Sequence, residues 1–161
     1  MKNEGDTVQN NLSFHIPTYS DDNSSHPKPV NDNYDYWVPL LNYFLAKSDT
    51  VEFHCWNEEV EIIEEIKSFQ NGKIEVVKEE NLTIFKGNNI FIFSDYLINH
   101  YNININKDRK FKWFTVNLNK GVESVFHSGH WGTEFFVPGV NEKDITFIKS
   151  VTPSKTIFHK I

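Results

Sequence analysis

The chain has 161 residues, of which 16 are basic and 22 acidic, so its formal net charge is −6. This acidic balance argues against nucleic-acid binding, which needs clustered positive charge, and the single cysteine excludes both a disulfide framework and a zinc site with several thiolates. The length suffices for one domain, whose core would draw much of its apolar area from 14 Phe, 6 Tyr and 4 Trp.

Residues 1–33 are mostly polar, and we expect them to form a mobile arm outside the domain. They contain no apolar segment typical of a secretory signal, and the chain has no apolar run long enough to cross a membrane. We therefore expect a cytoplasmic protein that makes no membrane contact. Within the arm, the alternating pattern of Leu12–Ile16 predicts a short strand at the edge of a sheet, ended by Pro17.

The folded domain is expected to cover residues 34–161. Apolar residues recur at helical spacing from Trp37 onward, which predicts a helix over residues 35–47. Residues 51–56 alternate apolar and polar side chains like a half-buried strand. Asn57 is a suitable N-cap, so a second helix is predicted over residues 57–70.

The rest of the sequence is typical of short strands separated by turn residues, and residues 94–100 fit either a short helix or an irregular crossover. Two helices followed by many strands predict an α+β fold, in which a mostly antiparallel sheet carries two helices on one face. The strands are predicted over residues 73–78, 82–86, 90–93, 111–118, 122–126, 134–137, 145–150 and 156–159.

His127 and His130 are the first candidates for chemistry. With Glu134 or His54 as a further ligand they suggest a metal site, but residues three apart on a strand point to opposite faces. The same two histidines suit the acid and base of a hydrolase or nuclease. We expect no metal at these residues, and we assign no catalytic residue.

Cys55 and the segment 107–113 offer two further alternatives. Cys55 beside His54 suggests a nucleophile with its base, but neighbouring strand residues face opposite ways, which favours a buried cysteine. The segment 107–113 interleaves basic and aromatic residues, and we interpret it as a solvated edge strand guarded by lysines. The sequence contains none of the glycine-rich phosphate loops, so no cofactor is expected.

The predicted helix over residues 57–70 carries the strongest functional signal. Its apolar residues fall on one half of the helical wheel, and four glutamates fall on the other half with only Lys67 to offset them. The simplest interpretation is a solvated face. Such a face is also suited to steer a cationic partner, with a neighbouring tryptophan as the apolar anchor. The candidate partner-binding residues are Trp56, Glu58, Glu61, Glu64 and Glu65.

A small acidic chain rich in Asn, Ile and Lys, with Glu58–Glu65 after an aromatic strand, resembles in type the immunity proteins of bacterial polymorphic toxin systems. Ala46 and Arg109 are the only residues of their types, which indicates an AT-rich gene, as in a low-GC bacterium or a prophage. The resemblance implies a cytosolic, non-enzymatic inhibitor that binds a cognate toxin protein. The alternatives are a small hydrolase or nuclease using His127 and His130, and a prophage structural or assembly protein.

Overall fold

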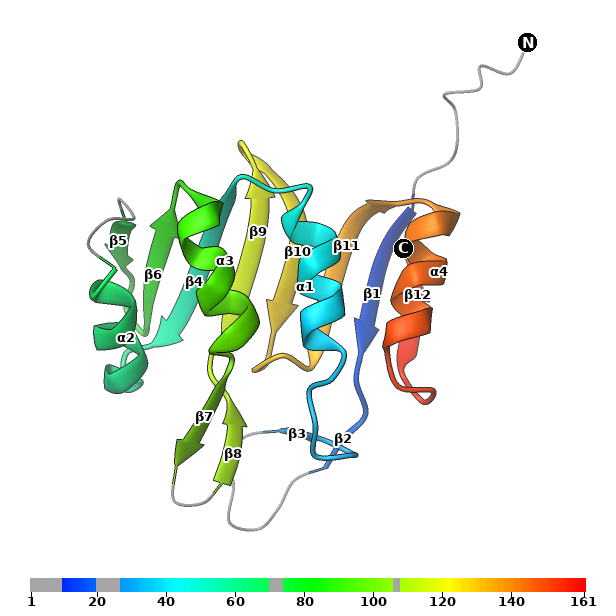
Figure 1. Cartoon of the computed structure of the whole chain (residues 1–161), viewed down its shortest axis with the longest axis horizontal. Helices are drawn as coiled ribbons and strands as arrows, with labels where there is room; N and C mark the ends of the chain where they lie inside the picture. The colour runs from blue at the N-terminus through cyan, green and yellow to red at the C-terminus, as the bar shows by residue number, and fades with distance from the viewer. Residues whose placement is uncertain (1–9, 20–26, 70–73, 106–107) are drawn as a thin grey trace.

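A computed structural model describes residues 10–19, 27–69, 74–105 and 108–161, and its largest element is an eight-stranded sheet (Figure 1). Each strand is antiparallel to its neighbours. In their order across the sheet the strands are β12 (Ile157–Lys160), β1 (Asn10–His15), β11 (Glu134–Val140), β10 (Glu123–Gly129), β9 (Thr115–Lys120), β4 (Thr50–Trp56), β6 (Leu82–Gly87) and β5 (Ile74–Lys78).

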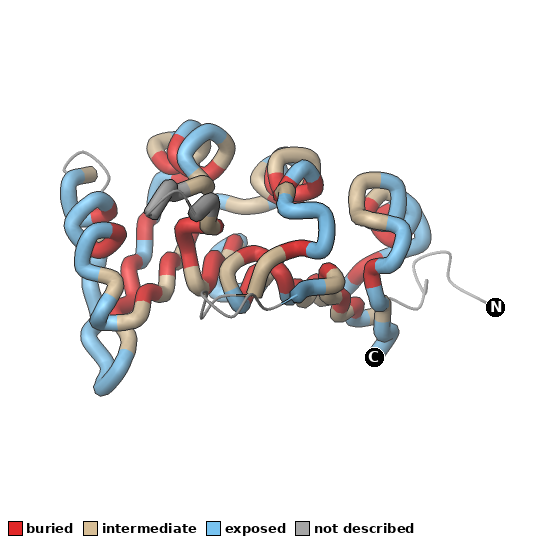
Figure 2. Tube along the Cα trace, turned by 90° about the horizontal axis from the view of Figure 1, so that it is seen from below, coloured by how far each residue is buried: buried red, intermediate tan, exposed pale blue. Residues whose placement is uncertain are grey.

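The helices of the described residues lie on one face of this sheet, and they leave the opposite face uncovered (Figure 2). They are α1 (Trp37–Leu45), α2 (Val60–Lys67), α3 (Ile90–Asn99) and α4 (Glu142–Val151). Two short ribbons pair β2 (Thr18–Tyr19) with β3 (Lys28–Pro29) and β7 (Asn102–Ile105) with β8 (Asp108–Phe111). The predicted α+β class with a mostly antiparallel sheet is confirmed, but the described residues place four helices on its covered face, where two were predicted. No helix in the described ranges is long and apolar enough to cross a lipid bilayer.

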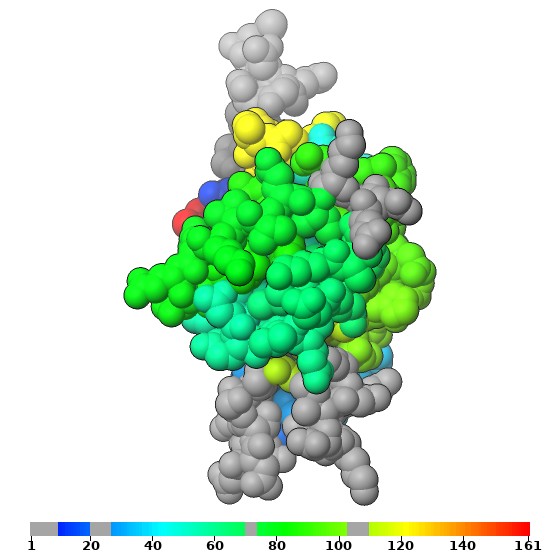
Figure 3. Space-filling model, turned by 90° about the vertical axis from the view of Figure 1, so that its left-hand side faces the viewer, coloured from blue at the N-terminus to red at the C-terminus, as the bar shows by residue number. Residues whose placement is uncertain are grey.

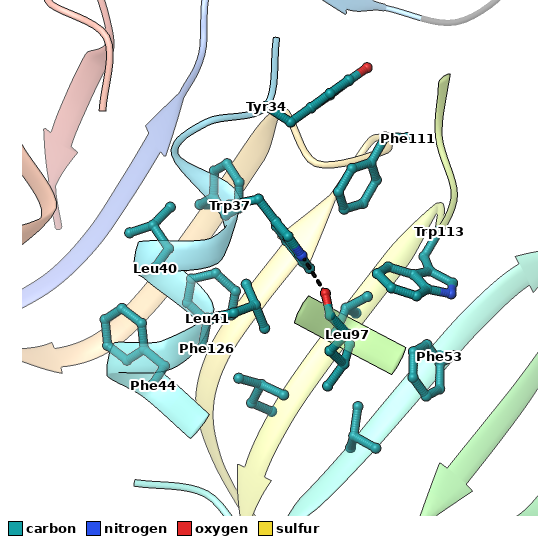
Figure 4. Packing of buried hydrophobic residues seen from close by; sticks show 14 of the residues in the cluster. Tyr34, Trp37, Leu40, Leu41, Phe44, Phe53, Leu97, Phe111, Trp113 and Phe126 are labelled. Atoms are coloured by element: carbon teal, nitrogen blue, oxygen red, sulfur yellow. Dashed lines mark hydrogen bonds between the residues drawn. The ribbon is translucent and has the colours of Figure 1, made fainter. Parts of the chain in front are cut away.

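The core fills the space between the helices and the sheet, and Trp37 lies at its centre (Figure 4). Its indole Nε1–H donates a hydrogen bond to the main-chain oxygen of Leu97 at 2.8 Å, which joins α1 to α3. Its ring packs against Phe111 at 4.6 Å and Trp113 at 6.1 Å between centroids. Since all three aromatic side chains are fully buried, each contributes a large apolar area to one continuous core.

Helix α2 is shorter than the predicted helix over residues 57–70. The expected N-cap, Asn57, instead uses its side chain to bind the Glu80 main-chain oxygen at 3.1 Å and the Thr83 hydroxyl at 2.8 Å. The helix begins at Val60, and Glu59 takes the N-cap position without capping it through its side chain. Hydrogen bonds to a distant hairpin therefore outweigh the local capping preference of Asn57.

Two predicted strands, over residues 90–93 and 145–150, are helical in the structure. Helix α3 starts at Ile90, because the Asn89 side chain accepts a hydrogen bond from the Phe91 amide at 3.1 Å. Helix α4 starts after a capping box, in which Asn141 and Asp144 satisfy each other's main-chain amides. Short apolar runs do not by themselves distinguish strand from helix, and in both segments the N-cap asparagine was the informative residue.

The prediction that residues 1–33 form an arm outside the domain is wrong for residues 10–16. Strand β1 lies inside the sheet, paired with β11 on one side and β12 on the other, so it is not an edge strand. Leu12, Phe14 and Ile16 are buried, and Phe14 stacks on Phe135 at 4.9 Å. Residues 1–9 and 20–26 of the expected arm lie outside the described residues.

We predict that Phe14→Ala lowers the free energy of unfolding by about 3–5 kcal/mol, because it leaves a cavity under β11 and β12. Ser13→Ala, on the uncovered face of the same strand, is the matched control and should change stability by less than about 0.5 kcal/mol. Equilibrium urea unfolding measures both variants. Equal unfolding midpoints for Phe14→Ala and the wild type would contradict an internal β1.

Candidate functional site

Helix α2 covers the end of the sheet where β4, β6 and β5 lie side by side, and Figure 3 shows this end of the molecule. Ile62, Ile63 and Ile66 are buried, whereas Val60, which the helical wheel placed with them, is 59% exposed. Glu58, Glu61 and Glu64 are exposed, and we call these three residues the acidic face. Its only ion pair among the described residues is the exposed contact of Glu64 with Lys67 at 3.7 Å.

Glu65 does not belong to the acidic face, although the helical wheel groups it there. Its carboxylate lies 2.5 Å from the Nζ of Lys112, whose side chain is almost fully buried, and it also accepts a hydrogen bond from the Tyr96 hydroxyl. Partial burial alone would raise the pKa of Glu65, but the hydrogen bonds from Lys112 and Tyr96 outweigh burial and hold that pKa below its ordinary value. Glu65 thus fastens α2 to the core.

The surroundings of Lys112 also show that the interpretation of the segment 107–113 as a solvated edge strand is wrong. Phe111 and Trp113 are fully buried, and Lys112 is only 5% exposed. The Lys112 ammonium group lies 5.0 Å from the centre of the Tyr96 ring, so an aromatic face and Glu65 together replace its water shell. Lys107 lies outside the described residues.

Glu59 joins the start of α2 to a group of half-buried rings. Its carboxylate accepts hydrogen bonds from the Trp56 main-chain amide at 2.9 Å and from the Trp131 indole Nε1–H at 3.3 Å. Phe114 lies between the two tryptophans, 5.0 Å from the Trp56 ring and 4.8 Å from the Trp131 ring. We call Trp56, Phe114 and Trp131 the aromatic cluster. The acidic face and the aromatic cluster meet at Glu59.

The turn that carries Trp131 has an unusual backbone. His130, Trp131 and Gly132 have φ angles of 48°, 54° and 76°, so three consecutive residues are left-handed. A left-handed conformation costs a residue other than glycine about 1–2 kcal/mol. The turn is held by hydrogen bonds from the Trp131 amide to the Phe114 oxygen and from the Tyr36 hydroxyl to the Gly132 oxygen. Backbone strain of this kind is common where a side chain must be presented in one position.

On the uncovered face of the sheet, the structure brings His54 and His127 together through Asn117. The Nδ1 of His127 lies 2.6 Å from the Asn117 side-chain oxygen, and the Asn117 amide nitrogen lies 3.5 Å from the Nε2 of His54. Burial lowers the pKa of His127, and the nearby His54 lowers it further. His130, the partner expected from the sequence, instead lies 3.4 Å from Glu134 in the strained turn.

Cys55 points away from these histidines, into the core between sheet and helices. Burial raises its pKa to about 12, and Glu59 adds to the rise, so the thiol stays protonated at neutral pH. Within the described ranges, no three His, Cys, Asp or Glu side chains are placed to hold a metal ion.

The helical wheel identified the acidic face, whereas no local sequence pattern marks Glu59, Phe114 and Trp131 as parts of the site. These residues come from three distant segments, and only the sheet brings them together. A search of protein-family models, curated proteins and solved structures finds no match to this chain.

We predict that Glu65→Gln lowers the free energy of unfolding by about 1–3 kcal/mol at pH 7, since Lys112 stays buried without its counter-charge. The pKa of Glu65 is lower in the folded than in the unfolded chain, so its contribution is present above the unfolded pKa and is lost as pH falls through the folded pKa. The difference in the free energy of unfolding between the variant and the wild type should therefore shrink as the pH falls.

Urea unfolding at a series of pH values measures this effect. Glu61→Gln, on the exposed side of the same helix, is the control and should follow the wild type within about 0.5 kcal/mol at every pH. A Glu65→Gln variant with wild-type stability at pH 7 would show that the ion pair with Lys112 does not hold α2.

Proposed function

We propose that this chain is a non-enzymatic immunity protein, which acts in the cytoplasm by binding and inhibiting a cognate cationic toxin protein. The observation that carries the proposal is the meeting of the acidic face and the aromatic cluster at Glu59. Exposed ion pairs alone contribute little affinity, whereas partly exposed tryptophans are typical of the residues that carry binding energy. The start of α2 offers both.

The charge distribution supports a cationic partner. Residues 57–86 contain eight glutamates and four lysines, so this segment carries −4 of the chain's net charge of −6. Concentrated charge of one sign raises the rate at which an oppositely charged protein is captured, and this effect weakens as salt shortens the Debye length. In α2 and the turn before it, four glutamates and one lysine form no ion pair with a buried group: Glu58, Glu59, Glu61, Glu64 and Lys67. Their net negative charge lies near the aromatic cluster.

Preorganisation also supports binding at this site. The Glu59 carboxylate and the strained turn hold the Trp131 ring in one position before any partner arrives. A side chain that is already ordered loses little conformational entropy on association, so more of the contact energy appears as affinity. A merely solvated surface would gain nothing from such strain.

The alternative of a hydrolase or nuclease depends on the histidines of the uncovered face. His54 and His127 are adjacent there, but active sites are generally concave. Two of the hollows that the described residues form, of about 170 and 240 Å³, are lined by residues other than these histidines. The buried Cys55 thiol likewise lacks the low pKa that a nucleophile needs. These observations favour a binding protein over an enzyme.

We predict that replacing Glu58, Glu61 and Glu64 together by Gln slows association with the toxin by about tenfold and weakens its salt dependence, while dissociation changes little. The partner to use is the product of the reading frame beside this gene, purified in an inactive form. Surface plasmon resonance at several salt concentrations gives both rate constants. We expect Trp56→Leu to raise the dissociation rate constant instead.

The matched control replaces three exposed acidic residues outside α2, by Asp35→Asn, Glu123→Gln and Glu142→Gln, so that net charge changes equally. This control should keep most of the wild-type association rate. Equal slowing in both triple variants would mean that net charge rather than the acidic face steers the toxin. No measurable binding of the wild type to this product would overturn its role as the toxin's inhibitor.

A further inference from the structure

Strand β5 is an edge of the sheet with an unoccupied side. It pairs with β6, and within the described ranges no strand pairs with its outer edge. Its sequence Ile-Glu-Val-Val-Lys favours extended structure, and Val76 and Val77 are 44% and 43% exposed. The outward main-chain N–H and C=O groups of an edge strand are a template for one more strand.

A hollow of about 240 Å³ lies between this hairpin and α2. Val60 and Ile63 form the apolar part of its lining from α2, and Thr83 and Lys78 line it from the hairpin. The hollow lies over the end of the β5–β6 hairpin, because its lining includes Lys78 and Thr83, which pair across the two strands. A strand added to β5 would place every second side chain on this side of the sheet.

The other side of the same edge is acidic. Glu75 and Glu79 are both exposed. Glu79 directly follows the last residue of β5, and its amide continues the hairpin by binding the Leu82 oxygen at 2.9 Å, so the spacing of four residues puts the two glutamates on one side of the hairpin. Lys86 pairs with Glu75 across the hairpin, but Glu79 and the neighbouring Glu80 have no ion pair among the described residues. Opposite charges directly across two strands stabilise their pairing, so this side favours basic residues on an added strand.

We infer that β5 accepts an extended, basic segment of the partner protein as an additional antiparallel strand, the orientation of every other pair in the sheet. Its basic side chains lie opposite Glu75 and Glu79, and its alternate apolar side chains enter the hollow beside Val60 and Ile63. The inference rests on the proposed function for the identity of the partner, but the recognition of an extended basic segment can be tested without that partner. Main-chain hydrogen bonds supply affinity in this mode, and the alternating side chains supply specificity.

The probe is a blocked synthetic peptide in which lysine and valine alternate, so that its extended form is basic on one face and apolar on the other. Two further versions carry N-methyl groups, one on every lysine amide and one on every valine amide. In a strand, alternate amides point to opposite edges, so each version blocks one edge only. We expect the parent peptide and one methylated version to bind the full chain, and the other version to bind at least about tenfold more weakly.

Glu75→Lys with Glu79→Lys is the variant that tests the acidic side, and Glu123→Lys with Glu142→Lys is the charge-matched control. Only the first pair should weaken peptide binding by about tenfold or more, as isothermal titration calorimetry measures. Equal binding of both methylated peptides, or equal weakening by the two variants, would overturn strand addition and indicate nonspecific attraction of a cation.

The two proposals fail in different ways. If the toxin binds and Glu75→Lys with Glu79→Lys leaves its affinity unchanged, the inference about β5 is wrong and the proposed function stands. If the adjoining gene's product does not bind but the peptides show the expected pattern, β5 is a strand-accepting edge and the proposed partner is wrong. A dimer of this chain that the same β5 variant dissociates would also overturn the inference, because the edge would belong to a second copy.

Discussion

The constraint on which the structure depends is that its helices cover one face of the sheet only. The strands must then send their largest buried apolar residues to that face, as β4 does with Val51, Phe53 and Cys55. The same strand sends Glu52 and His54 to the uncovered face, so a shift of one residue would bury a carboxylate and an imidazole. This penalty fixes the register, and Trp37 then fills the single core from the helix side.

The candidate site is connected to this core through hydrogen bonds. The Trp113 indole N–H donates to the Tyr96 hydroxyl at 3.3 Å, and the Tyr96 hydroxyl donates in turn to Glu65 of α2. Helix α2 has eight residues and no side-chain N-cap, so it would be marginal in isolation. Its position depends on three buried isoleucines and on the ion pair of Glu65 with Lys112. The core therefore holds α2, which carries most of the acidic face, in a fixed position.

The sequence was sufficient to predict elements whose signal is local and periodic. The alternation of residues 51–56 and the helical spacing after Trp37 correspond to β4 and α1, and together with the turns they led to the correct fold class. The apolar runs at residues 90–93 and 145–150 were wrongly predicted as strands, because the patterns of strand and helix coincide over so few residues. The internal position of strand β1 was not predicted, because its two neighbours, β11 and β12, lie more than 100 residues away in the sequence.

The candidate site shows the same division between local and distant causes. Five glutamates lie in α2 and the two residues before it, and the helical wheel groups four of them as equivalent, but their partners differ. Glu59 and Glu65 are bound by Trp131 and Lys112, which no local pattern relates to α2. What remains is Glu58, Glu61 and Glu64, whose mutual repulsion is offset within the described residues only by the exposed Lys67. A like-charged face that gains so little from its own chain is suited to a cationic partner, and this reasoning supports the proposed function independently of any resemblance.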